Sequence, residues 1–188
     1  RGPGRLTRRR NSMNRCPSPS CFALVLIVSA LSSCTSDHTP KPRGFFRIAL
    51  PERSYQEYAG DCPFSFEYPV YSELVPDTEA GAEPCWINVE FPRFRGTLHL
   101  SYKSVHDGNL RKLTEDSRTL AMKHTMRAEA INERLFTTDH NVYGLRYDIE
   151  GNAASYLQFY LTDSARHFLR GSFYFNTLPQ ADSLAPVA

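Results

Sequence analysis

The last third of the chain reads "YGLRYDIEGNAASYLQFYLTDSARHFLRGSFYFN" over residues 143–176, and this stretch decides the fold. Three runs in it place apolar side chains at every second position, which is the period of a β-strand with one packed face. The short runs "EGN" and "TDSAR" between them have the composition of turns. We expect three antiparallel strands in a meander, with one face packed and one face in water. The apolar positions are Tyr143, Leu145, Tyr147 and Ile149, then Leu157, Phe159 and Leu161, then Leu169, Phe173 and Phe175.

Earlier segments add a second group of strands. The runs "FSFEYP" (64–69), "WINVEF" (86–91) and "GTLHLSYK" (96–103) alternate in the same way. The run "PRFRG" (92–96) reads as the hairpin turn between the last two. A glycine inside a strand often marks a bulge, so Gly171 is a candidate β-bulge.

One helical pattern separates the two strand groups. Asn109 is the expected N-cap, and apolar or small residues return on one face at helical spacing as far as Ile131. Such a helix buries its apolar stripe against the sheet. The sequence therefore predicts a single α+β domain, in which one long helix packs on one face of an antiparallel sheet built from two strand groups. The positions on the helix face are Leu110, Leu113, Ser117, Leu120, Ala121, His124, Ala128 and Ile131.

The first 33 residues predict upstream sequence and a lipoprotein signal peptide. The run "CFALVLIVSAL" (21–31) is shorter than the roughly 20 residues that cross a bilayer, but it fits the apolar part of a signal. We take Met13 as the start of translation and residues 1–12 as upstream sequence. Leu31-Ser32-Ser33-Cys34 resembles a bacterial lipobox, whose cysteine receives lipid (palmitate among the acyl chains) and becomes the new N-terminus. The alternative is a buried helix that ends in an incidental cysteine.

Residues 34–44 are expected to form the lipidated end and a tether, because prolines in a polar run favour extended backbone. Residues 45–188 then form the folded domain. Six of the 22 basic residues precede Cys34 and no acidic residue does, so 16 basic and 20 acidic residues follow and the mature part carries a net charge of −4. This balance excludes the large basic surface of a nucleic-acid-binding protein.

Cysteine parity predicts one disulfide. Two of the five cysteines lie in the signal and Cys34 is the lipidation site, which leaves Cys62 and Cys85 in an oxidising compartment. The alternative is two unpaired buried thiols. Their spacing fits no zinc motif. The segment 72–84 inside the closed loop lacks periodicity and reads as surface loop.

The chain carries no catalytic signature, since HExxH, P-loop, GxSxG and GxGxxG motifs are all missing from it. Ser117 and His124 attract attention, but on one straight helix they lie about 10.5 Å apart along the axis, too far for a nucleophile and its base. We interpret His124 as a neutral structural histidine. We expect no catalytic residue, no bound metal, no cofactor and no enzyme activity.

The alternating row Trp86, Asn88 and Glu90 has two readings. It could form a sugar or peptide platform, since tryptophan at a surface is usually partly covered by a partner. It could equally lie under the loop 72–84, which is the reading we favour.

Six long runs together resemble the gliding motility lipoprotein GldD family, over about Thr39 to Pro186. They are "TPKPRGFFRIALPERSY", "DCPFSFEYP", "CWINVEFPRFRGTLHLSYK", "EDSRTLAMKHT", "VYGLRYDIEGNAASYLQFYLTDS" and "HFLRGSFYFN". The resemblance implies an exported lipoprotein of the cell envelope, required for gliding and linked to the protein secretion machinery that supports it. It assigns Cys34 as the lipid site and Cys62 and Cys85 as a pair, and it offers no catalytic residue.

Two functions follow as expectations. The first is a non-enzymatic structural or interaction component, held periplasm-facing on a membrane by its lipid, with other motility and secretion proteins as partners. The alternative is a lipid-anchored envelope hydrolase or ligand-binding module. A broad aromatic surface favours the first, and a deep pocket with convergent polar groups favours the second.

Overall fold

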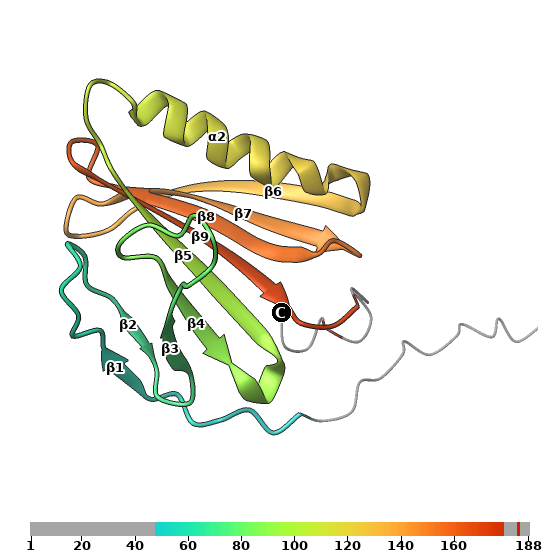
Figure 1. Ribbon diagram of the computed structural model, residues 1–188. Helices are drawn as coiled ribbons and strands as arrows, with labels where there is room; N and C mark the ends of the chain where they lie inside the picture. Colours follow the sequence, from blue (N-terminus) through green and yellow to red (C-terminus); the bar gives the residue numbers. More distant parts are fainter. Residues whose placement is uncertain (1–47, 179–183, 185–188) are drawn as a thin grey trace, which may run out of the picture. The chain divides into compact units, whose positions relative to one another are not determined.

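The computed structural model describes residues 48–178 and residue 184, so the signal, Cys34 and the tether lie outside the described residues. A seven-stranded antiparallel sheet has the order β3-β4-β5-β9-β8-β7-β6, and helix α2 lies along one face of it (Figure 1). A two-stranded sheet, β1-β2, stands beside it. The elements are β1 (Tyr55–Glu57), β2 (Glu67–Pro69), β3 (Glu73–Pro76), β4 (Ile87–Phe91), the 3-10 turn η1 (Pro92–Phe94), β5 (Gly96–Ser104), α2 (Leu110–Met122), the 3-10 turn η2 (Lys123–Met126), β6 (Ala128–Thr137), β7 (Tyr143–Gly151), β8 (Ser155–Thr162) and β9 (His167–Phe175).

The predicted α+β class and the antiparallel sheet are confirmed. The meander of the last third is β7-β8-β9, and β9 pairs with β5, which joins the two strand groups into one sheet. No helix within residues 48–178 is long and apolar enough to cross a membrane.

The predicted helix is too long at its C-terminal end. The α-helix stops at Met122, a 3-10 turn follows, and Ala128 and Ile131 belong to strand β6, which the sequence reading missed. The run "AEAINERLFT" contains good helix formers, so its local preference is ambiguous. Pairing with β7 over nine registered positions decides the outcome in favour of a strand.

Two further strand predictions need correction. Strand β3 lies inside the segment expected to be loop and pairs with β4 through Leu74 and Val89. The run at 64–69 forms a strand only over its last three residues, where β2 pairs with β1. Both elements are short, and their pairing partners rather than their own alternation define them.

The sheet is packed on both faces, which corrects the expectation of one solvated face. Residues directly opposite each other in a ladder share a face, and Tyr147 opposes Gln158. The apolar residues of β7 therefore point toward α2, whereas Leu157 and Phe159 point to the other face. On the helix side the buried core is Ala121, Tyr147, Ile149 and Ala153.

The second face is covered in part by the chain before β4. The ring of Phe64 packs at a tilt against Tyr102 of β5 with ring centres 5.7 Å apart, and Tyr71 meets Phe91 of β4 at 6.2 Å. A disulfide joins Cys62 to Cys85 with Cα atoms 5.6 Å apart, as the cysteine parity predicts. The covalent link holds the segment between β1 and β2 close to the start of β4.

Gly171 is not a bulge, because β9 stays in register with β5 and β8 through this position. Its missing side chain makes room for the ring of Phe159, since a Cβ atom there would come within 2.2 Å of Cζ of that ring. The irregularity lies in β8 instead, between Ser155 and Leu157. It places the extra residue Tyr156 at the rim of the second face.

Candidate functional site

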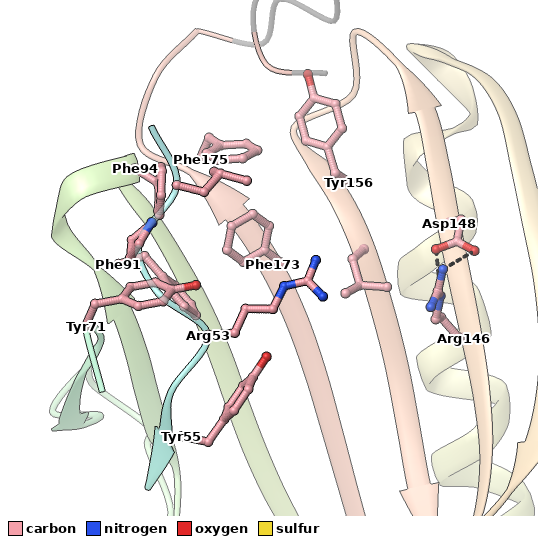
Figure 2. A pocket seen from close by; sticks show the side chains of 13 residues that line it. Arg53, Tyr55, Tyr71, Phe91, Phe94, Arg146, Asp148, Tyr156, Phe173 and Phe175 are labelled. Atoms are coloured by element: carbon pink, nitrogen blue, oxygen red, sulfur yellow. Dashed lines mark hydrogen bonds and ion pairs between the residues drawn. The ribbon is translucent and has the colours of Figure 1, made fainter. Parts of the chain in front are cut away.

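The face of the sheet opposite α2 is hollowed by a groove of about 490 Å³, which we call the aromatic groove (Figure 2). The segment before β1 forms one rim, the β4-β5 turn forms another, and β7, β8 and β9 form the floor. Its lining residues are Leu50, Pro51, Arg53, Tyr55, Tyr71, Phe91, Phe94, Arg146, Asp148, Tyr156, Leu157, Phe173 and Phe175.

An aromatic wall follows from the register of three strands. Phe91 and Phe175 both lie opposite Gly96, on either side of β5. A Cβ atom on Gly96 would meet Cζ of Phe173 at 2.6 Å, so glycine lets that ring lie over the backbone. The rings of Phe173 and Phe175 then meet edge to face with centres 4.9 Å apart, and Phe173 meets Phe91 at 5.9 Å. Such edge-to-face contacts stabilise the packing of the apolar wall.

The opposite side of the groove carries a closed ion pair. Arg146 and Asp148 are two residues apart on β7, so their side chains share a face. The guanidinium donates from Nε to Oδ1 at 2.7 Å and from Nη2 to Oδ2 at 2.9 Å. The hydrogen bond to Asp148 raises the pKa of Arg146, and the opposite charges of the pair offset each other. A carboxylate held in this way is a poor general base.

Arg53 supplies the uncompensated charge of the groove. It reaches in from the segment before β1, beside Tyr55, and forms no ion pair within the described part of the chain (Figure 2). That segment is fastened across the β4-β5 turn, because Arg93 donates from Nη2 to the carbonyl of Ala49 at 2.6 Å. The groove is therefore apolar along its aromatic wall and positively charged at the rim that carries Arg53.

Tyr156 closes the end of the groove. Its ring meets Phe175 edge to face at 5.5 Å, and burial raises the pKa of its phenol. The hydroxyl is buried and has no hydrogen-bond partner among residues 48–178. A buried unpaired hydroxyl costs about 1–3 kcal/mol.

A second cavity of about 390 Å³ lies at the far end of the same face, near Tyr102, Asp163 and His167. Tyr102 and Nδ1 of His167 share a hydrogen bond of 2.8 Å. Burial raises the pKa of Asp163, but the backbone amides of Arg166, His167 and Ala165 outweigh it and hold the pKa at about 2. This carboxylate caps a turn and makes no hydrogen bond to the ring of His167, so the two do not form an acid–base pair.

The histidine singled out by the sequence is half-buried and partnered. His124 lies on η2, and its Nε2 is 2.8 Å from Nε2 of Gln158, which donates to it. Arg170 in turn donates to Oε1 of Gln158 at 3.0 Å. Burial lowers the pKa of His124, and the charge of Arg170 lowers it further, so the ring is neutral at pH 7. Ser117 is buried and makes no hydrogen bond to this ring.

The side chains of Trp86 and Asn88 already contact other residues of the domain. Trp86 donates from Nε1 to the carbonyl of Tyr102 at 3.1 Å, and the ammonium of Lys103 lies 5.3 Å from its ring centre. Lys103 also pairs with Glu83 of the segment 72–84. Asn88 bonds to Nδ1 of His99 at 2.8 Å. These contacts leave no open platform at Trp86, and no cluster of metal ligands occurs among the described residues.

The groove was not predicted from the sequence because its parts come from six separate segments. The signal for the aromatic wall was present, since Phe173 and Phe175 lie two apart, but it read as ordinary core. The pattern Arg146-Tyr147-Asp148 was a usable signal for an ion pair on one strand face.

The fold and the groove define a small α+β domain with an open, mostly aromatic groove on one face of its sheet. The sequence model of the gliding motility lipoprotein GldD matches residues 35–188, and the chain belongs to that family. It is therefore a lipoprotein of the cell envelope associated with gliding motility.

Among solved structures, the chain is similar to the solution structure of cyanobacterial PsbP (CyanoP) from Synechocystis sp. PCC 6803. The identity is 17%, the TM-score is 0.47, and the match covers 76% of this chain and 90% of that one. No curated protein sequence matches the chain.

Proposed function

We propose that this protein is a non-enzymatic interaction component of the gliding apparatus and of the secretion machinery that supports it. Residues 1–33 carry the upstream sequence and signal, and Cys34 carries the lipid. Residues 34–44 are the tether of the periplasm-facing domain 45–188. In this proposal the aromatic groove holds a segment of a partner polypeptide.

The aromatic groove is the observation that supports this function. Aromatic side chains and arginine are the residues most enriched where protein interfaces are buried and strong. The wall around Phe173 suits apolar side chains, and Arg53 suits a carboxylate. Among the described residues that line the groove, Asp148 is the one carboxylate, and it is closed onto Arg146. A segment with apolar and acidic residues fits these groups better than a substrate that needs proton transfer.

Tethering makes a weak contact sufficient. Eleven residues in extended conformation span at most about 40 Å, so the domain stays close to its membrane. Confinement raises its effective concentration toward other membrane-bound proteins by orders of magnitude compared with free diffusion. The groove then needs only a modest affinity for its partner.

The test substitutes two groove residues that are exposed and are not part of the hydrophobic core. Arg53→Glu and Tyr55→Ala are expected to abolish spreading on a surface when combined, at unchanged protein level and unchanged thermal midpoint. The matched control is Lys112→Glu/Thr119→Ala, two exposed residues of α2 on the opposite side of the sheet. Normal spreading by the Arg53→Glu/Tyr55→Ala strain would refute the role of the groove.

A further inference from the structure

Strand β6 is an open edge of the main sheet. It lies last in the strand order, next to β7 on one side only (Figure 1). Residues 132–137 are all exposed, on both faces of the strand. No backbone hydrogen bond to its outer side occurs within the part of the chain that the structure describes. A row of free amides and carbonyls of this kind is a template for another strand.

One hydrogen bond shows which residues of β6 direct their backbone amides and carbonyls away from β7. The amide of Thr138 donates to the carbonyl of Val142 at 2.9 Å, so this pair is a hydrogen-bonded pair of the β6-β7 ladder. Hydrogen-bonded and non-bonded pairs alternate in an antiparallel ladder. Ile131, Glu133 and Leu135 therefore direct their amides and carbonyls away from β7.

The opposite edge of the sheet is blocked, whereas β6 is not. Strand β3 has four residues and ends in Pro76, and short strands with proline resist further pairing. Strand β6 has ten residues and contains no proline. Its one irregularity lies between Ala128 and Ala130, which leaves the exposed part regular.

The side chains beside the open edge indicate which residues a pairing strand should carry. Leu135 is 78% exposed on the helix side, and Phe136 is 37% exposed on the other side. Arg134 precedes these two residues. It is exposed and forms no ion pair with any described residue. Glu133 is already paired with Arg118 of α2 at 3.3 Å. A complementary strand would place apolar residues at Leu135 and Phe136 and an acid at Arg134.

A second copy of this chain does not meet that requirement. Two identical strands related by a two-fold axis keep the same faces together, so Arg134 can lie directly opposite only residues of its own face. On the regular part of β6 these are Ala130, Asn132, Arg134 and Phe136, and none is acidic.

We infer that β6 accepts an extended, acidic and apolar segment of another protein as an eighth strand of the sheet. Backbone pairing would supply most of the affinity, and Arg134 with the two apolar neighbours would set the register. This surface lies at the sheet edge and its assignment does not depend on the aromatic groove.

The first test uses the full lipoprotein in detergent and the synthetic peptide Thr-Val-Val-Asp-Thr-Thr-Val, whose aspartate can lie opposite Arg134. Added peptide is expected to slow hydrogen exchange at the amides of Ile131, Glu133 and Leu135. Replacing its aspartate by lysine should weaken binding by about fivefold, as for one exposed ion pair. Unchanged exchange at these amides would overturn the inference. Protection that rises with protein concentration without peptide would also overturn it, in favour of a second copy.

Backbone and side-chain contributions are separated by three variants. Leu135→Pro removes an outward amide but no bond to β7, so the fold should persist while peptide protection is lost. Leu135→Ala keeps the amide and should retain much of the binding. Arg134→Glu should bind the lysine peptide better than the aspartate peptide. Equal binding by Leu135→Pro and the wild type, at equal thermal midpoints, would contradict strand addition. If Leu135→Pro does not fold, the charge exchange at Arg134 decides the question alone.

Discussion

His124 shows how burial sets the state of a single side chain. Its ring accepts a hydrogen bond from Gln158, which requires a neutral nitrogen, and its pKa is lowered by burial and then by Arg170. Between this lowered value and the ordinary value of about 6.5, the unfolded chain binds a proton that the folded chain does not. The free energy of unfolding must therefore fall as the pH falls through this window.

We expect His124→Gln to weaken this pH dependence. The glutamine keeps an acceptor oxygen for Gln158 but does not titrate, so the gap in stability between wild type and variant should narrow from pH 7.5 to pH 5. Urea unfolding at both pH values measures it. The exposed His140→Gln should retain the wild-type slope. A variant that loses stability with acid as steeply as the wild type would show that His124 is not responsible.

Gly171 is a position where the ring of Phe159 occupies the space that a side chain would need. Gly171→Ala should lower the free energy of unfolding by about 1–3 kcal/mol, because its Cβ atom would overlap the ring of Phe159. Adding Phe159→Leu should recover part of that loss, since the smaller side chain vacates the space. Denaturant unfolding of the two single variants and the double variant gives the coupling. Simple additivity would mean that the ring is not the obstacle.

At the scale of elements, local patterns predicted the sheet well and the boundary between helix and strand poorly. The alternation in β5, β7, β8 and β9 is visible in each strand alone, and all four were expected. Strand β6 forms because it pairs with β7, since its own residues favour a helix about as strongly as a strand. The aromatic groove could not be predicted, because Phe91, Phe173 and Arg53 meet only after the sheet has formed.

The disulfide belongs to the same scale, because it links the loop between β1 and β2 to the loop before β4. Removing it as Cys62→Ser/Cys85→Ser should cost about 2–5 kcal/mol, since the unfolded chain regains the freedom of the closed loop. Using the double variant avoids a lone thiol. Denaturant unfolding should give the same midpoint for this variant and for the reduced wild type. A midpoint equal to that of the oxidised wild type would mean that the bond adds no stability.

At the scale of the whole molecule, the proposed surfaces act only if the domain is held at a membrane. The aromatic groove reaches Arg146 of β7, which lies directly opposite Arg134 of β6, so the two proposed surfaces adjoin each other on one sheet. Each contact is small, and an interface of this kind gains most from confinement. Loss of the anchor should then impair both contacts together.

Cys34→Ala is therefore expected to abolish surface spreading and to weaken the associated secretion, although the folded domain is still made. Labelling with a fatty-acid analogue should mark the wild type and not this variant. The decisive control replaces residues 1–33 by an unrelated transmembrane helix facing the same compartment. If the lipid acts only as a tether, the replacement should restore spreading to Cys34→Ala cells. Full activity of Cys34→Ala without any anchor would refute the tether, and failure of the helix to rescue would assign the lipid a role beyond attachment.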